Sequence, residues 1–252
     1  MFDKLTPITR NIIIANVVVY LLANFVFQKW YFLLSAYYPF SPNFRWWQVI
    51  THMFMHAPFQ GGGAGITHII FNMFTLVSFG PVLEQVLGPK KYFWLYLLSG
   101  LGAFLIFNMW NFVEINQLAT QLNAMGIDSA EIFRKAAIGF QGDYNIDVKN
   151  AQGAQLAQSL IESLQTPMMG ASGAIFGIVA AFATMFPDAK LMFFFIPFPI
   201  KAKILLPIVI LISVYLGFSG NMSGVAHFAH VGGAIVGFIL AKIWKNNQYR
   251  IN

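Results

Sequence analysis

Four polar side chains stand within stretches of the chain that are otherwise apolar: His68, Asn72, Ser172 and His230. A serine hydroxyl is a weak nucleophile unless a base lies within hydrogen-bond reach, and an imidazole can be that base. Ser172 stands in the segment Gly170-Ala-Ser-Gly, whose small residues leave the hydroxyl accessible. We therefore predict that Ser172 and His230 act as nucleophile and general base in acyl transfer.

Acyl transfer also needs hydrogen-bond donors for the negative oxygen that develops on the attacked carbonyl group. The N–H of Ser172, near the start of a predicted helix, is one candidate donor. His68 and Asn72, spaced i and i+4 on one helix face, are two more, and Gly170 belongs to the same auxiliary group. The alternative is that His68 and Asn72 only form hydrogen bonds between helices.

No carboxylate is close enough in the sequence to complete a triad. Glu162 lies ten residues before Ser172 in a polar segment, and Asp188 lies at the opposite end of the predicted helix. At about 1.5 Å of rise per residue, Asp188 is roughly 24 Å from the serine. We therefore expect a Ser–His dyad rather than a triad.

Small residues could bring the two helices of the dyad together. Gly173-xxx-Gly177 follows the serine, and Gly233-xxx-Gly237 follows His230. This spacing lets helix backbones approach closely. Phe176, one turn after the serine, is then placed to pack against the imidazole. The alternative is that a serine among Gly and Ala residues serves helix packing alone.

The other histidines offer alternatives. His227 competes with His230 as the base, but only His230 is followed by glycine at the third and seventh positions. His52 and His56 have the i, i+4 spacing of metal ligands, with His68 as a third. No His-Glu-x-x-His motif is present, so a structural role for His52 and His56 is favoured. We expect neither a metal nor another cofactor.

The composition shows which elements must position these residues. Of 252 residues, 58% are hydrophobic and 10% charged, with a mean hydropathy of +0.64. Soluble domains are about 45–50% apolar and about 25% charged, so a soluble domain, a disordered chain and a coiled coil are excluded. With no cysteine, disulfides and thiolate sites are excluded too. The sequence predicts a polytopic membrane protein.

A helix needs about 20 mostly apolar residues to cross a hydrocarbon core of about 30 Å. The fold class that we predict is an all-α polytopic membrane protein, a six-helix transmembrane bundle forming a single domain over 1–252. A short interfacial piece at 191–200 precedes the fifth span. The predicted spans are 11–28, 65–87, 92–110, 170–186, 204–218 and 225–244.

Basic residues orient the bundle, because they favour the cytoplasmic side. With both termini in the cytoplasm, the outer side holds five basic and six acidic residues. The net charge of +6 is then a topology signal, and we expect no nucleic-acid partner. The four polar residues all fall in the first two turns of spans that enter from outside, at one depth. The inner side holds ten of the fifteen basic residues: Lys4, Arg10, Lys90, Lys91, Lys190, Lys201, Lys203, Lys242, Lys245 and Arg250.

Two outer segments have their own character. The first outer loop, 29–64, is rich in aromatic residues: nine of the eighteen from Trp30 to Trp47. Tryptophan and tyrosine rings favour the headgroup level, so we expect this loop to lie partly in the outer leaflet. The segment 111–167 predicts an extended helical insertion outside the membrane, with Asp128 before Glu131 resembling a capping box.

These motifs together resemble those of the rhomboid intramembrane serine proteases. The resemblance rests on His68-xxx-Asn72, Gly170-Ala-Ser172-Gly and Ala229-His230-xx-Gly233-xxx-Gly237, in this order, and covers about 46–243. It implies that Ser172 is the nucleophile, His230 the base, and His68 and Asn72 part of the oxyanion site. It further implies that the loop 217–224 is a mobile cap and that Glu84 is structural.

The sequence departs from the family pattern in several places. Trp47-Gln48 stands where the family often has Trp-Arg, which leaves the role of the first outer loop in doubt. Phe176 replaces a frequent tyrosine and keeps only its ring. The segment 111–167 is longer than in compact members, and 61–65 resembles an insertion.

The resemblance implies an endopeptidase that cuts transmembrane or juxtamembrane segments of membrane proteins near the outer face. Its partners would be such substrates and membrane lipid, and its location a bacterial inner membrane. A non-catalytic relative that binds membrane clients would lack the serine or the histidine, and both are present. A transporter would show paired repeats and charges at the membrane midplane, and neither is seen.

Overall fold

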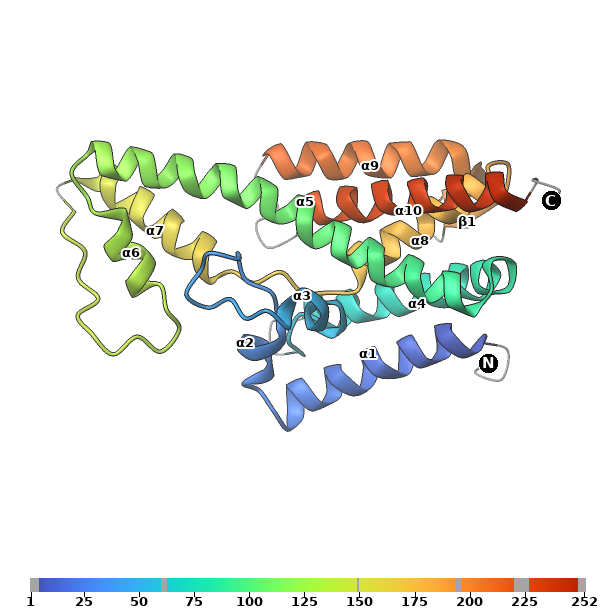
Figure 1. Cartoon of the computed structure of the whole chain (residues 1–252), viewed down its shortest axis with the longest axis horizontal. Coiled ribbons are helices and arrows are strands. Elements are labelled where there is room, and N and C mark those ends of the chain that lie inside the picture. The colour runs from blue at the N-terminus through green and yellow to red at the C-terminus, as the bar shows by residue number, and fades with distance from the viewer. Residues whose placement is uncertain (1–4, 60–62, 149, 194–195, 220–226, 249–252) are drawn as a thin grey trace.

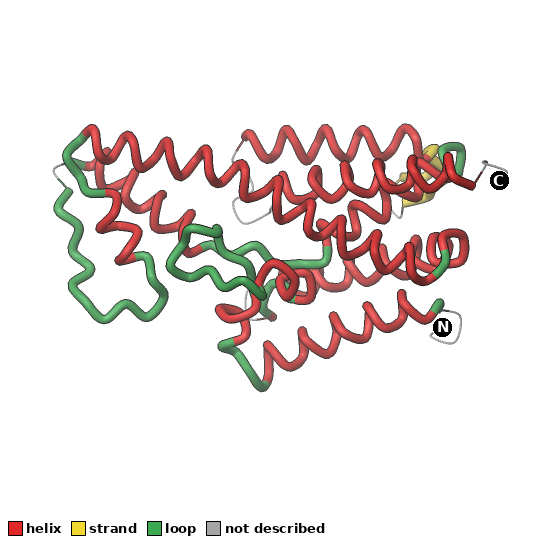
Figure 2. The backbone as a smooth tube through the Cα atoms, viewed as in Figure 1, coloured by secondary structure: helices red, strands yellow, loops and turns green. Residues whose placement is uncertain are grey.

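The computed structural model describes residues 5–59, 63–148, 150–193, 196–219 and 227–248. Across these residues the chain is almost entirely helical, with one pair of short strands (Figure 2). The predicted all-α class is therefore confirmed. The elements are α1 (Pro7–Phe25), α2 (Trp30–Leu34), α3 (Gln48–Thr51), η2 (His52–Phe54), α4 (Gly63–Leu87), α5 (Pro89–Ala124), α6 (Ser129–Lys135), α7 (Ala151–Gln165), α8 (Ser172–Met185), β1 (Lys190–Phe193), β2 (Ile196–Lys201), α9 (Ala202–Ser219) and α10 (His227–Gln248).

Helix α8 lies at the centre of the bundle. It contacts α4, α5, α9 and α10, and most of its side chains are buried. Helix α1 packs at the edge against α4 and α5, and the start of α1 and the end of α10 lie at the same end of the bundle (Figure 1). We call the opposite end, which carries α6 and α7, the outer end.

The bundle is apolar both inside and on its sides. Leu76, Leu83 and Ile178 are fully buried, whereas Phe71 is 62% and Leu211 67% exposed on the outer faces of their helices. Large apolar side chains that face outward need a lipid environment. Helices α1, α4, α5 and α10 are long and apolar enough to cross a membrane, and α8 and α9 are shorter apolar helices. The chain is a multi-pass integral membrane protein, and the count of six spans stays a prediction.

The helix that contains the third predicted span, 92–110, extends beyond that span. Helix α5 continues to Ala124, and its 36 residues make it about 54 Å long, well beyond a hydrocarbon core of about 30 Å. Exposed large apolar side chains occur on α5 only up to Val113. Beyond this point Ile115 and Leu122 are buried against α6 and α7. The membrane signal ends near Trp110, but packing outside the membrane extends the helix.

The predicted insertion at 111–167 thus begins within α5. The outer end of α5 with α6 and α7 forms an outer module that has its own small core, including Ile132 and Leu160. The short helices expected in this segment are confirmed, and the Asp128 carboxylate caps α6 by accepting from the N–H of Ala130 at 2.9 Å. The reciprocal half of a capping box is not formed, because Glu131 pairs with Lys135 instead.

The predicted interfacial piece at 191–200 forms most of an antiparallel hairpin of β1 and β2. Pro197 and Pro199 lie in β2, and proline removes backbone donors that a helix would need. The remaining predicted spans agree with observed helices to within about four residues at each end. Three of the basic residues used to predict the orientation of the bundle lie outside the described part of the chain: Lys4, Lys149 and Arg250.

The start of α1 is held by a carboxylate from α4. Glu84 is 3% exposed, and its oxygens accept from the N–H groups of Ile8 and Thr9 at 2.9 and 2.8 Å. The hydroxyls of Thr6 and Thr9 donate to the same carboxylate. These bonds satisfy donors that the first turn of a helix leaves without partners. Helix α1 therefore begins at Pro7, four residues before the predicted start.

Candidate active site

Ser172 and His230 meet where α8 and α10 begin. The Oγ of Ser172 lies 3.0 Å from the Nε2 of His230, although the residues are 58 positions apart in the chain. Ser172 is the first residue of α8, and His230 lies in the first turn of α10. When Nε2 carries no proton, the hydroxyl donates to it. This is the geometry that a general base needs to take a proton from a nucleophile.

The imidazole of His230 is held by a neighbouring ring. Phe176 stacks on it with ring centroids 4.1 Å apart and an angle of 1° between the planes. His227 lies edge-on to the same imidazole, with centroids 6.2 Å apart. The structure therefore places His230 against the serine and His227 beside His230. Phe176 fixes the plane of the imidazole by stacking, without needing a hydroxyl.

Glycines allow α8 and α10 to touch. A Cβ atom on Gly233 would collide with the carbonyl oxygen of Gly173, and one on Gly237 would collide with that of Gly177. Because the backbones are in contact at both levels, a larger residue would push the helices apart. The two small-residue faces noted in the sequence thus bring Ser172 and His230 within hydrogen-bond distance.

A third helix takes part in this close packing, which the sequence reasoning missed. A Cβ on Gly177 would collide with the hydroxyl of Ser99 on α5, and one on Gly232 with the carbonyl oxygen of Gly102. The small residues of the third span carried a signal that could have revealed it: Ser99, Gly100, Gly102 and Ala103. The dyad is therefore set by three helices rather than two.

His68 presents one ring nitrogen to the space next to the serine. Its Nδ1 accepts the N–H of Ala57 at 3.3 Å. A backbone N–H can only donate, so Nδ1 carries no proton and the neutral ring carries its proton on Nε2. His68 is thereby set as a donor at Nε2. This tautomer follows from the hydrogen-bond partner rather than from an observed hydrogen atom.

Gly170 opens the space that lies between His68 and Ser172. Its φ is +124°, a conformation that side-chain-bearing residues rarely adopt, and its N–H donates to the carbonyl of His52 at 2.9 Å. A Cβ on Gly170 would lie 3.0 Å from the Nε2 of His68 and 3.6 Å from the Oγ of Ser172. A small oxygen atom in this space could therefore reach both groups.

Asn72 lies one turn after His68 and is buried. Its Nδ2 donates to the carbonyl oxygen of His68 at 2.7 Å, a bond within α4. One of its amide hydrogens is therefore engaged by its own helix. Asn72 is brought to the same turn of α4 as His68, and its role as an oxyanion donor stays a prediction.

The remaining histidines have partners of their own. His52 is hydrogen-bonded to the carbonyl of Gln48, and His56 Nε2 to the Oδ1 of Asn16, each at 2.8 Å. His56 also packs edge-on against His68, with ring centroids 5.2 Å apart. Among the described residues, no group of three His, Cys, Asp or Glu side chains is placed to hold a metal ion.

The two carboxylates weighed as a third member of the site lie elsewhere. Asp188 forms ion pairs with Lys201 and Lys203 at the end of the bundle opposite to the serine. Glu162 is exposed on α7 and accepts from the amide of Gln158 at 2.8 Å. Neither carboxylate is placed to orient His230.

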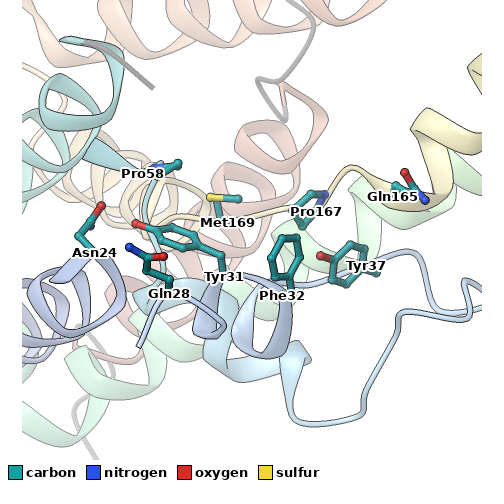
Figure 3. A pocket seen from close by; sticks show the side chains of 9 residues that line it. All are labelled: Asn24, Gln28, Tyr31, Phe32, Tyr37, Pro58, Gln165, Pro167 and Met169. Atoms are coloured by element: carbon teal, nitrogen blue, oxygen red, sulfur yellow. The ribbon is translucent and has the colours of Figure 1, made fainter. Parts of the chain in front are cut away.

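A cavity of about 360 Å³ lies near the site without including the dyad. The cavity lies between two parts of the chain: the end of α1 together with α2 on one side, and the segment that leads to Ser172 on the other. Met169, in that segment, lines it (Figure 3). Tyr37, also in its wall, is 1% exposed, and its hydroxyl has no hydrogen-bond partner in the described part of the chain. Burial raises the pKa of Tyr37 to about 12, so the hydroxyl stays protonated. No motif in the sequence indicated this cavity.

Two further predictions cannot be placed in full. The cap predicted at 217–224 lies outside the described residues from 220 onward. Of the insertion predicted at 61–65, residues 61–62 also lie outside the described part of the chain.

The family model described as Rhomboid domain matches residues 43–116 and 147–246, which is more than half of the chain. This chain belongs to the rhomboid family. The match includes all four polar residues of the site. It leaves out 117–146, which comprises the outer end of α5, α6 and the loop that follows, so the family model accounts for α7 but not for these parts of the outer module of this rhomboid.

Curated relatives of this rhomboid come from mitochondria and from bacteria. An uncharacterized mitochondrial rhomboid protein of Schizosaccharomyces pombe is 25% identical over 81% of the chain and 53% of the relative. Rhomboid protein 1, mitochondrial, of Saccharomyces cerevisiae is 26% identical over 73% of the chain and 41% of the relative. The rhomboid protease AarA of Providencia stuartii is 25% identical over 81% and 58%. The chain thus spans about half the length of these relatives.

Proposed function

We propose that this rhomboid is an intramembrane serine endopeptidase that cleaves transmembrane or juxtamembrane segments of other membrane proteins near the outer face. The observation that carries the proposal is the 3.0 Å distance between the Oγ of Ser172 and the Nε2 of His230 inside a membrane-embedded bundle. Family membership and relatives that are named proteases support the same function.

In the first half of the reaction, the Nε2 of His230 takes the proton of the Ser172 hydroxyl while Oγ attacks the carbonyl carbon of the scissile bond. The tetrahedral intermediate collapses when the C–N bond breaks and the imidazolium gives its proton to the departing nitrogen. In the second half, a water molecule loses a proton to His230 and attacks the acyl-serine. The acid is released and Ser172 is restored.

The negative oxygen of the intermediate would occupy the space next to Gly170. The Nε2–H of His68 faces that space, as does the Oγ of Ser172. The N–H of Ser172 is one of the donors that the first turn of α8 leaves free. One side-chain donor and one backbone donor from two different helices would thus stabilise the oxyanion, with Asn72 as an additional donor.

The short length of α8 supports cleavage below the outer membrane surface. Its 14 residues span about 21 Å, less than a hydrocarbon core of about 30 Å. A helix this short cannot reach both surfaces. Because its last turn is bonded to Lys245 near the basic inner end of the bundle, a site at its first residue would lie below the outer surface. A substrate segment that unwinds there would bring its carbonyl group to the serine. Substrates are therefore expected to carry helix-loosening residues near the cut.

Location and topology complete the proposal. Six spans with both termini in the cytoplasm account for the basic residues at the inner end, and lipid surrounds the bundle. We propose a bacterial cell membrane as the location, and bacterial proteins are among the relatives that match.

Replacing the nucleophile tests the proposal directly. We expect Ser172→Ala to abolish both labelling by a fluorophosphonate probe and cleavage of single-span substrates, because no other group takes over attack on the carbonyl. Ser78→Ala is the matched control, since Ser78 lies exposed on α4 and its hydroxyl donates to the carbonyl of Phe74 in the same helix. Both variants should show the thermal stability of the parent protein in detergent.

Two outcomes would contradict the proposal. Undiminished cleavage by the Ser172→Ala variant would exclude this serine as the nucleophile. A parent protein that binds membrane clients but neither labels nor cleaves would be a non-catalytic binder.

A further inference from the structure

Helices α8 and α9 are connected by the antiparallel strands β1 and β2, which we call the hairpin. The first residue of β1 and the last residue of β2 are both lysines. Lys190 in β1 and Lys201 in β2 are direct partners across the antiparallel pair. Side chains at such positions project from the same face, with Cβ atoms about 4.5–5.5 Å apart, and like charges there repel. Lys203 follows two residues after the pair. We call Asp188, Lys190, Lys201 and Lys203 the hairpin base.

The hairpin base contains one carboxylate and three ammonium groups, and the carboxylate pairs with two of them. The Oδ1 of Asp188 lies 2.8 Å from the Nζ of Lys203 and 3.3 Å from that of Lys201. Lys190 forms no ion pair with any residue that the structure describes. All three lysines and Asp188 are exposed. The hairpin base therefore carries an excess of positive charge that an anion from outside the chain can reach.

The rest of the hairpin is suited to a membrane interface. The ten residues 191–200 carry no charged or hydrogen-bonding side chain, and Met192 is 74% exposed. Apolar side chains are unfavourable in water. A two-stranded sheet, however, leaves backbone N–H and C=O groups at its edges, and these are costly in hydrocarbon. The headgroup level satisfies both requirements, and phosphate groups lie there.

We propose that the hairpin base binds the phosphate of an anionic phospholipid, at the end of the bundle opposite to the dyad. A phosphate between Lys190 and Lys201 offsets the repulsion of the pair, and clusters of basic residues at a membrane surface attract anionic lipids. Asp188 competes with the lipid for Lys201 and Lys203. This binding site goes beyond the proposed function and does not depend on it.

Lipid retention by the full chain tests the site. The protein is placed in nanodiscs of phosphatidylcholine and phosphatidylglycerol in equal parts, and the lipids that stay bound after release are counted by native mass spectrometry. We expect Lys190→Gln with Lys201→Gln to lower the preference for phosphatidylglycerol roughly ten-fold, because in the proposed site these two lysines together hold one phosphate group. No substrate is present, so the result is independent of cleavage.

Two further variants separate a site from general surface charge. Lys90→Gln with Lys91→Gln removes the same charge from the first turn of α5, at the same end of the bundle (Figure 1). This control should keep the preference of the parent protein, whereas Asp188→Asn should raise it by freeing two lysines. If the control pair loses the preference as fully as the hairpin pair, the attraction is diffuse and the site is refuted. A lowered preference in Asp188→Asn would also overturn the proposal.

Discussion

At the scale of residues, the candidate site is built from side chains whose orientations are set by their neighbours. The N–H of Ala57 occupies the Nδ1 of His68 and leaves Nε2 as the donor. The stacked ring of Phe176 holds the plane of His230 while its Nε2 faces the serine. In the proposed mechanism, proton transfer and oxyanion stabilisation fall to two different imidazoles, each held in one orientation. Neither task requires a charged side chain inside the bundle.

Gly170 offers a test of the oxyanion space. In Gly170→Ala, the new Cβ would lie 2.9 Å from the Cε1 of His68 and 3.0 Å from its Nε2. It would fill the space that the negative oxygen needs. Loss of one oxyanion donor typically lowers kcat by about 10² to 10³, and we expect a decrease of at least that order. Cleavage and fluorophosphonate labelling measure it.

The matched control for this variant is Gly139→Ala. Gly139 also has a positive φ, +82°, but its Cβ would meet no atom within 4 Å. Both variants carry the backbone strain of a positive φ, about 1–3 kcal/mol, and only Gly170→Ala fills the site. Equal activity in the two variants would show that the space at Gly170 holds no reacting atom.

The identity of the dyad could be predicted from sequence because glycine spacing and residue type are local. The tautomer of His68 and the φ of Gly170 could not. The first depends on the N–H of Ala57, and the second on a bond to the carbonyl of His52, a residue far away in the chain. Both contacts arise only when the first outer loop packs against α4 and α8.

At the scale of elements, α8 shows how a short helix can be held at a fixed depth. Its first residue is the serine, and the ammonium of Lys245 on α10 donates to the carbonyl of Thr184 at 3.0 Å near its last turn. A positive charge at a helix C-terminus is favourable because of the helix dipole. Glycine contacts on one side and this lysine at the far end thus fix α8 against α10.

A second element-scale contact, between α1 and α4, predicts a loss of stability. In Glu84→Gln, the amide cannot accept all of the bonds from Thr6, Ile8 and Thr9 and presents its own donors to them. Buried donors left without partners cost about 1–3 kcal/mol. We expect a lower thermal unfolding temperature in detergent, with the pattern of fluorophosphonate labelling at low temperature retained. Ser172 and His230 lie on α8 and α10, and the site residues of α4, His68 and Asn72, lie toward the opposite end of that helix from Glu84.

Glu114→Gln is the control, because Glu114 is exposed on α5. It should leave the unfolding temperature unchanged. Equal stability of the two variants would show that the carboxylate does not hold the start of α1.

At the scale of elements, hydropathy predicts which residues face lipid, but it predicts neither where a helix ends nor whether an apolar segment is a helix or a strand. Hydropathy marks the lipid-facing part of α5, yet the helix continues because Ile115 and Leu122 find a core outside the membrane. Residues 191–200 are apolar enough for a helix, yet Pro197 and Pro199 disfavour one because they lack the backbone N–H groups that a helix needs. In both cases tertiary packing or backbone chemistry decides the element, and a hydropathy window contains neither.

At the scale of the whole molecule, the outer module is tied to the segment that leads to the serine. The Oγ of Ser41 in the first outer loop donates to the carbonyl of Leu164 at 2.8 Å, and Asn43 bonds to Ala136. Ala36 and Met168 then form a two-bond bridge four residues before the serine. The outer module, the first loop and the start of α8 therefore form one hydrogen-bonded unit.

The topology of the whole molecule gives a final prediction. The chain has no cysteine, so a single introduced cysteine reports its own side of the membrane. Gln155 on α7 and Asn246 near the end of α10 are both exposed. In intact cells, a membrane-impermeant maleimide should label Gln155→Cys and spare Asn246→Cys, which should react only after lysis. The excess of basic residues at the end that holds Asn246 favours retention of that end in the cytoplasm. The reverse labelling pattern would invert the bundle and place the serine near the cytoplasmic surface, whereas labelling of both positions in intact cells would put an even number of spans between them.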